Sequence, residues 1–259
     1  MIAAKEFVTA DHIGEGRVGV NIVVGWNEGE FDMFGVKQRE HDARYDYAQE
    51  WIDVVKLAWS RDGNLQLKNA RAFPKPYGHT RPLLMNAGSS DVGQAFALRN
   101  CDAFFVATAG SRTSLAGNAA KLAEIKAAAS ALDRQIEVFT VGQVICRPSQ
   151  QEAEDYYRHV NIEHADWDAI DGMLANKSIT PQTIGAQEYD KKRRYFAANA
   201  IGGYPFVGTP DRVAEELAII SQAGVRGIGL SFVNYLAEVP YFCDEVLPRL
   251  QRVGVRMAD

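Results

Sequence analysis

The sequence has few cysteines, no long apolar run and no excess of positive charge. Its three cysteines, Cys101, Cys146 and Cys243, are widely spaced, which excludes a disulfide framework or a cysteine zinc site and is typical of a reducing compartment. No run of about 18 apolar residues occurs, and the first residues include acidic side chains, so we expect neither a membrane span nor a signal peptide. The net charge of -5 offers no basic field for nucleic acid or an acidic membrane. We therefore expect a cytoplasmic protein.

Several catalytic and metal-binding patterns are also missing. The chain has no GxSxG nucleophile elbow, no Walker phosphate loop and no HExxH pair. Among the five histidines, His159 and His164 are the two closest in the sequence. They are five residues apart, which is not a zinc-ligand spacing. The sequence therefore predicts no metal site.

What is present is an alternation of apolar runs and amphipathic segments, typical of a mostly parallel sheet covered by helices. Short apolar runs bounded by turn residues predict five strands, over 18–24, 83–87, 103–107, 138–145 and 227–232. Helical spacing predicts helices over 1–12, 43–60, 113–132 and 240–252, and Thr209 with Pro210 predicts the start of another. Residues 26–42 are interpreted as a loop. Residues 150–200 lack a strand pattern, are mainly helical and are too long for an ordinary connection.

Polar residues follow the predicted strands where ligands bind in parallel α/β folds. Asn21 interrupts an apolar strand, and a buried amide there would suit a heteroaromatic ring; it is about equally well explained as a cap of its own strand end. Arg44 and Tyr45 lie at a predicted helix start, where their donors would favour anionic oxygens, although a surface arginine beside a core tyrosine explains them too.

Two glycine-containing segments are further candidates. A strand runs through Gly88, Ser89 and Ser90 into a helix, which would form an anion-binding turn suited to phosphate, or simply a serine N-cap. Residues 202–210, which begin with two glycines, suggest a hinge or lid near the binding face, or a plain linker.

Taken in order, these segments resemble the luciferase-like flavin-dependent monooxygenases, particularly the pyrimidine, alkanesulfonate and nitrilotriacetate monooxygenase branches. The runs that carry the resemblance are 11–26, 44–47, 87–91, 207–211, 230–232 and 245–248. The resemblance implies a TIM (β/α)₈ barrel over residues 1–259 that is N-terminally truncated, with about five βα units present and a helical insertion or lid at 150–205. Eight such units make a complete barrel, so the first strands of the family would precede the helix that begins here.

The resemblance also implies a cofactor, partners and site residues. The cofactor is reduced FMN supplied by a separate NAD(P)H:flavin reductase, and the substrates are O₂ and a small organic molecule. A homo-oligomer, dimer or tetramer, is expected. In the family, six counterparts contact the flavin: Asn21 and Glu30 on the isoalloxazine side, Arg44 and Tyr45 at the ribityl phosphate end, and Ser89 with Ser90 at the phosphate. No catalytic residue is assigned.

One departure and two alternatives remain. Alkanesulfonate-type enzymes place an arginine just before the counterpart of Gly202, where this chain has only small and apolar side chains and Asn199; Arg193 and Arg194 lie nearby and could serve if this segment folds inward. The chain could instead be a deazaflavin-dependent oxidoreductase of the same superfamily. It could also be a non-catalytic flavin-binding fragment that requires a partner chain.

Overall fold

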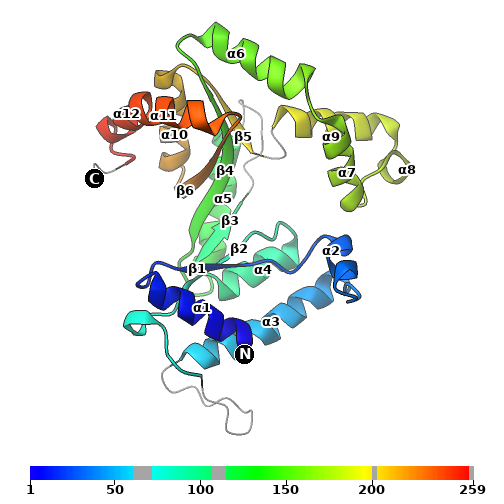
Figure 1. Cartoon of the computed structure of the whole chain (residues 1–259), viewed down its shortest axis with the longest axis vertical. Helices are drawn as coiled ribbons and strands as arrows, with labels where there is room; N and C mark the ends of the chain where they lie inside the picture. Colours follow the sequence, from blue (N-terminus) through cyan, green and yellow to red (C-terminus); the bar gives the residue numbers. More distant parts are fainter. Residues whose placement is uncertain (61–71, 107–114, 200–202, 257–259) are drawn as a thin grey trace. The chain divides into compact units, whose positions relative to one another are not determined.

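The computed structural model describes residues 1–60, 72–106, 115–199 and 203–256, which form two compact units (Figure 1). The first unit comprises residues 1–105 and 127–137, and the second comprises residues 106–126 and 138–259. Each unit is built around parallel strands with helices packed beside them. Among the described residues, no helix combines the length and apolar character needed to cross a membrane.

The first unit holds three parallel strands, β1 (Gly19–Ile22), β2 (Leu83–Asn86) and β3 (Ala103–Phe105). Gly19 pairs with Leu83 and Ile22 with Asn86, so the two strands run in register over four residues. The surrounding helices are α1 (Ile2–Ile13), α2 (Glu28–Met33), α3 (His41–Trp59), the 3₁₀ turn η1 (Tyr77–His79) and α4 (Asp91–Asn100).

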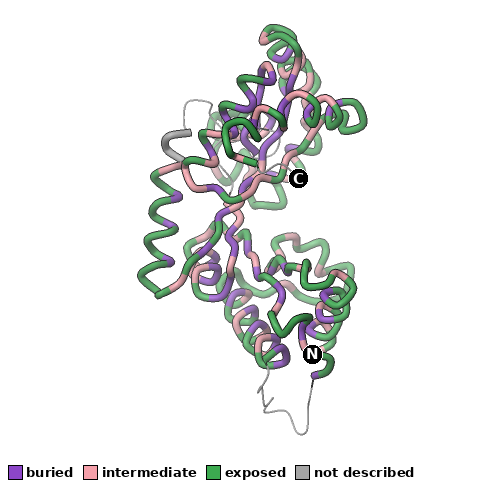
Figure 2. Tube along the Cα trace, turned by 90° about the vertical axis from the view of Figure 1, so that its left-hand side faces the viewer, coloured by how far each residue is buried: buried purple, intermediate pink, exposed green. Residues whose placement is uncertain are grey.

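One face of this sheet is buried and the other is open. On β1 and β2 the residues Val20, Ile22 and Leu84 are buried with the inward side of α3, including Ile52 and Val55. The alternate positions of the two strands are exposed or half-buried, as the two-residue period of a strand requires. Figure 2 shows buried residues along the strands and on the inward sides of the helices in each unit.

The second unit holds β4 (Glu137–Cys146) from Val138 onward, β5 (Tyr204–Gly208) and β6 (Val225–Phe232), with β5 and β6 both pairing with β4 in parallel. Its helices are α6 (Gln150–Arg158), the π-turn η2 (His159–Glu163), α7 (Trp167–Asn176), α8 (Pro181–Ile184), α9 (Ala186–Ala198), α10 (Pro210–Gln222), α11 (Tyr235–Glu245) and α12 (Leu247–Arg252). Helix α5 (Leu115–Ser130) belongs to the second unit as far as Lys126.

Three sequence predictions about elements were wrong. Residues 204–208 form a fully buried strand, not a hinge or linker, because their register with β4 places each of them in the core. A proline such as Pro205 is tolerated at a strand position that does not need its N–H for pairing. Residues 26–42 contain helix α2, capped by Asn27, whose side chain accepts from the Gly29 N–H. The C-terminal helix is two helices, and Pro248 lies in the first turn of the second, where its missing N–H is not needed for a helical hydrogen bond.

Other predicted elements agree within a few residues, including α1, α3, α5, α10 and the mainly helical stretch over 150–200. Thr209 caps α10, accepting a hydrogen bond from the Arg212 N–H at 3.4 Å. Ala107, residues 113–114 and residues 200–202 lie outside the described residues, and parts of the predictions for 103–107, 113–132, 150–200 and 202–210 fall on them.

Candidate functional site

The turn after β1 is shaped by a glycine and tied to the start of α3. Gly25 has a φ of +77°, and a Cβ there would lie 2.5 Å from Phe31 Cε2, so both the backbone conformation and the lack of space require glycine. Its carbonyl oxygen accepts hydrogen bonds from Arg44 Nη1 and, at 3.2 Å, from Gln38 Nε2. The carboxyl end of β1 is therefore held by the first turn of α3.

A pocket of about 550 Å³ lies beside this turn, within the range of small-ligand sites. Its walls are apolar and charged, and they come from β1, the turn after β1, helix α2, the loop that follows α2, and helix α3. The lining residues are Ile22, Val23, Val24, Gly25, Glu30, Phe31, Phe34, Val36, Lys37, Arg39, Arg44, Tyr47 and Ala48. Arg39 stacks over the ring of Tyr47 at 4.3 Å. Three cations and one carboxylate in the lining favour an anionic or electron-rich ligand.

Arg44 leaves one donor unused in this lining. Its Nε is buried and has no hydrogen-bond partner among the described residues, although its Nη1 is bound to Gly25. A buried unpaired donor costs about 1–3 kcal/mol. A ligand oxygen that reached this nitrogen after a small movement of the pocket lining would satisfy that donor.

The turn between β2 and α4 is a second candidate element of the site. Asn86, which is buried, donates from Nδ2 to the Ile22 carbonyl at 2.6 Å and accepts from the Gly88 N–H at 2.8 Å. Gly88 and Gly93 lie against the hydroxyl of Tyr45; a Cβ on Gly93 would lie 2.5 Å from that oxygen. The two glycines thus make a cradle that an added methyl group would fill.

Ser90 is the N-cap of α4. Its Oγ accepts from the Gly93 N–H at 3.2 Å, while the hydroxyl hydrogen can still donate to a ligand. Ser89 is exposed, and its carbonyl accepts from Gln94 Nε2 at 3.1 Å. Ser90 is thus a serine N-cap, which is one of the two explanations given above for this turn, and its hydroxyl group at a helix start would also suit an anion.

Neighbouring residues of α3 connect the two elements. Arg44 reaches the carboxyl end of β1, and Tyr45, whose ring packs 5.8 Å from that of Phe96, reaches the turn before α4. Glu30 lines the pocket with Arg44, and its Oε1 accepts from Asn27 Nδ2 at 3.2 Å. The structure thus brings Glu30 and Arg44 to one pocket, and Tyr45 to the turn that contains Ser89 and Ser90.

The expectation that Asn21 is a buried amide was wrong. It lies on the open face of the sheet, because β1 turns Val20 and Ile22 toward the helices and therefore Gly19 and Asn21 away from them. The buried amide is Asn86, which sequence reasoning missed. An asparagine two residues before a glycine is the pattern of an Asx-turn, and it was the available signal.

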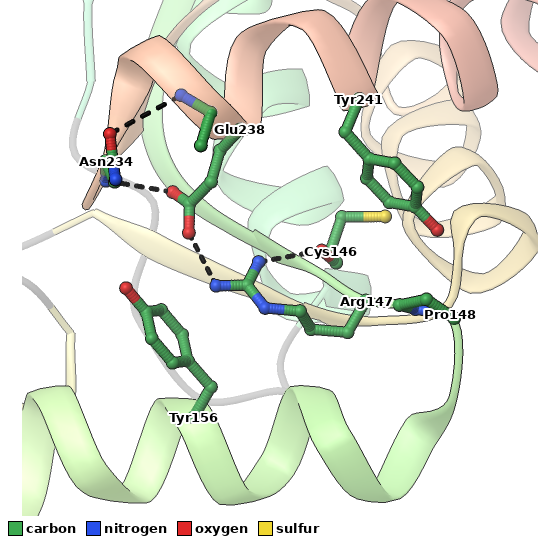
Figure 3. Close-up of a pocket in the computed structure, with 8 residues that line it drawn as sticks. Cys146, Arg147, Pro148, Tyr156, Asn234, Glu238 and Tyr241 are labelled. Atoms are coloured by element: carbon green, nitrogen blue, oxygen red, sulfur yellow. Dashed lines mark hydrogen bonds and ion pairs between the residues drawn. The ribbon is translucent and has the colours of Figure 1, made fainter.

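A different pocket of about 420 Å³ lies in the second unit, at the end of β4 (Figure 3). Figure 3 shows Arg147 lying between Glu238 and Tyr156; its Nη2 is 2.6 Å from Glu238 Oε1, and its guanidinium lies 4.0 Å from the ring centre of Tyr156. Glu238 also accepts from the Asn234 N–H at 3.1 Å, and burial raises the pKa of the Cys146 thiol to about 11. The charges here satisfy one another, and this pocket contains none of the six predicted residues.

The two arginines that were considered for a sulfonate are already paired. Arg193 makes two bonds to Asp171, at 2.6 and 2.8 Å, and stacks 4.5 Å from the ring centre of Trp167. Arg194 is 2.8 Å from Asp190 on the same helix. Hydrogen bonds to these carboxylates raise the pKa values of both arginines. Both guanidinium groups therefore form ion pairs within the helical segment rather than a binding site for a sulfonate.

Comparison with known proteins gives the family. Residues 1–227 match the luciferase-like monooxygenases, and the chain belongs to this family. It is 30% identical over 265 residues to the FMNH(2)-dependent dimethylsulfone monooxygenase of Pseudomonas fluorescens (strain Pf0-1), covering 98% of this chain and 71% of that protein. It is 26% identical over 265 residues to the pyrimidine monooxygenase RutA of Allorhizobium ampelinum, covering 96% and 70%.

A solved structure agrees with this fold. DmoA from Hyphomicrobium sulfonivorans superimposes with a TM-score of 0.81 at 23% identity, covering 100% of this chain and 66% of that one. The prediction of a parallel α/β fold of the luciferase-like type is therefore confirmed, as is the predicted family.

Proposed function

We propose that the first unit binds reduced FMN between the pocket beside Gly25 and the turn that contains Ser90, and that the protein oxygenates a small organic molecule with O₂. The observation that carries this proposal is the buried, unpartnered Nε of Arg44 in the pocket wall. The names of the two relatives given above, FMNH(2)-dependent dimethylsulfone monooxygenase and pyrimidine monooxygenase, support the same class of reaction.

The residues present fit this cofactor. Ser89, Ser90 and the start of α4 would hold the phosphate, and Tyr45 fixes the shape of the glycine cradle beside them. Arg44 would donate to a flavin oxygen through its free Nε. Glu30 and the apolar side chains of the pocket would contact the isoalloxazine ring, and Asn21, on the open face of β1, would meet the ring only where it extended past the edge of the pocket.

The chemistry divides between cofactor and protein. Reduced flavin supplies two electrons to O₂, so that one oxygen atom enters the substrate and the other leaves as water. Arg44 and the turn before α4 would bind and orient the cofactor, while Val24 and Phe31, which are half-buried in the pocket wall, would limit the access of water to it. We further propose that a separate NAD(P)H:flavin reductase delivers the reduced flavin.

A binding titration with a matched control tests the proposal. Replacing Arg44 by methionine removes the guanidinium but keeps the stem, and the loss of one charge-assisted hydrogen bond of about 1.5–3 kcal/mol should weaken FMN binding roughly 10- to 100-fold. Arg99→Met, an exposed arginine near the other end of α4, should leave binding unchanged. Quenching of flavin fluorescence measures both constants.

Oxygen consumption coupled to a flavin reductase completes the test. Product formation that depends on an added organic substrate is expected, and it argues against a non-catalytic fragment. Binding of a deazaflavin in place of FMN would assign the chain to hydride transfer instead. Equal FMN affinity in the Arg44→Met and Arg99→Met variants would show that FMN does not bind at Arg44 and would contradict the proposed site.

A further inference from the structure

The π-turn η2 places two histidines and a glutamate on one exposed side of the second unit. His159, Glu163 and His164 each offer one ligand atom, and these atoms all lie within 4.8 Å of one another. Within the described parts of the chain, this is the one group of three metal-ligating side chains that converges in this way. None of them belongs to the proposed flavin site.

The local helix geometry explains why the sequence spacing did not predict this group. In an α-helix of 3.6 residues per turn, side chains five residues apart point roughly 140° away from one another. Here the His164 N–H donates to the His159 carbonyl at 3.0 Å, which is the five-residue bond of a π-turn, so His164 falls one turn above His159. Their rings are in contact, with centres 4.1 Å apart.

The inner side of the same turn is fixed to the sheet. Asn161 is buried and donates from Nδ2 to Gln143 Oε1 of β4 at 2.8 Å. With Asn161 held inward, His159, Glu163 and His164 are left on the exposed side. The arrangement therefore does not depend on three freely mobile side chains meeting by chance.

The hydrogen bond made by the His164 ring suits a metal ligand. Its Nδ1 lies 3.1 Å from the His159 carbonyl oxygen, which can only accept, so Nδ1 carries the hydrogen and Nε2 presents the lone pair. A histidine that donates one ring nitrogen to a carbonyl and binds metal with the other is the usual arrangement in metal sites.

The spacing of the other two ligands also fits. His159 Nδ1 and Glu163 Oε2 are 3.7 Å apart, too far for a hydrogen bond. Two ligands at about 2.0–2.1 Å from one tetrahedral zinc ion are separated by roughly 3.4 Å. Exposed side chains need to close by only about 1.4 Å at most, from 4.8 Å, to reach that geometry.

We propose that His159, Glu163 and His164 bind one divalent transition-metal ion, of which Zn²⁺ is the best match, with water at the fourth position. Two imidazoles and one carboxylate suit zinc and its neighbours, whereas Mg²⁺ and Ca²⁺ require mainly oxygen ligands. The ion would link the two ends of the π-turn and so hold α6 to the start of the segment that leads into α7.

The test is Zn²⁺ binding to the whole chain without a histidine tag, measured by calorimetry, together with the visible absorption of the Co²⁺ form. One ion per chain is expected, and His159→Gln and His164→Gln should each weaken binding roughly tenfold or more. The control is His79→Gln, an exposed histidine of the first unit, which should leave both the affinity and the cobalt spectrum unchanged.

Because all three side chains are exposed, the variants should keep the far-ultraviolet circular dichroism of the parent. Glu163→Gln should alter the cobalt spectrum, since it replaces a charged ligand. Absence of binding in the parent chain would overturn the site, as would equal affinity in the His159→Gln, His164→Gln and His79→Gln variants.

Discussion

The cradle before α4 can be tested by adding a single methyl group to it. Gly93→Ala in α4 would place a Cβ 2.5 Å from the Tyr45 hydroxyl, where ordinary contacts begin near 3.4 Å, so Tyr45 would have to withdraw by about 0.9 Å. Its ring is buried against Phe96, which leaves little room to do so. The Cβ would also meet the Cα and carbonyl carbon of Gly88 at 2.9 and 3.0 Å.

The expected sign follows from two opposing effects. Replacing glycine by alanine within a helix stabilises by roughly 0.5–1 kcal/mol, whereas overpacking a filled site costs about 1–3 kcal/mol. Gly93→Ala should therefore lower the free energy of unfolding by roughly 0.5–2 kcal/mol. Gly172→Ala in α7 has no atom within 4 Å of the new Cβ, so the same change there should raise that free energy by roughly 0.5–1 kcal/mol.

Urea unfolding followed by tryptophan fluorescence measures both values under the same conditions. The double variant Gly93→Ala/Tyr45→Phe removes the hydroxyl and should recover much of the loss, but not the part caused by the Gly88 backbone. If Gly93→Ala proves as stabilising as Gly172→Ala, the packing described for Tyr45 and the cradle is wrong.

Two further predictions concern acid and thiol chemistry. Partial burial by itself would raise the pKa of Asp102, but hydrogen bonds from Arg81 Nη1 at 2.5 Å and the Leu84 N–H at 2.9 Å hold it below its usual value. That stabilisation is present above the unfolded pKa of about 3.9 and is lost as the pH falls through the lower folded value, so Asp102→Asn should destabilise at neutral pH and flatten the acid limb of stability against pH. An unchanged acid limb would count against this reasoning. Iodoacetamide should label Cys243, which is exposed, far faster than Cys101 and Cys146, because both are buried and burial raises their pKa values to about 11; peptide mass spectrometry identifies the sites, and equal labelling of all three would contradict the burial.

Elements that depend on neighbouring residues could be predicted from the sequence. Thr209 and Pro210 begin α10 as expected, because the cap bond and the proline geometry involve only the next few residues. Strand β5 was missed for the opposite reason. Its five residues contain a proline and end in glycine, and they become a strand only by pairing with β4, about sixty residues earlier in the chain.

The orientation of side chains was harder to predict than the elements themselves. Tyr47 stands at helical spacing from Trp51, Val55 and Ala58, which are buried or half-buried, yet Tyr47 itself is 51% exposed and Tyr45 is 6% exposed. In α1, likewise, Ile2 and Ile13 are exposed while Ala4 and Val8 are buried. An apolar side chain fits two adjacent faces of a helix equally well, and only the partners that pack against it decide which face turns inward.

The candidate site depends on which face of α3 turns inward. Successive residues of an α-helix point about 100° apart, so Arg44 and Tyr45 can reach different neighbours from a single turn. Arg44 binds the carboxyl end of β1, and Tyr45 packs against the glycines that precede and begin α4. A rotation of α3 that buried Tyr47 would detach both contacts together. The start of α3 is therefore the part of the first unit on which the pocket beside Gly25 and the turn before α4 both depend, although its residues form only part of each.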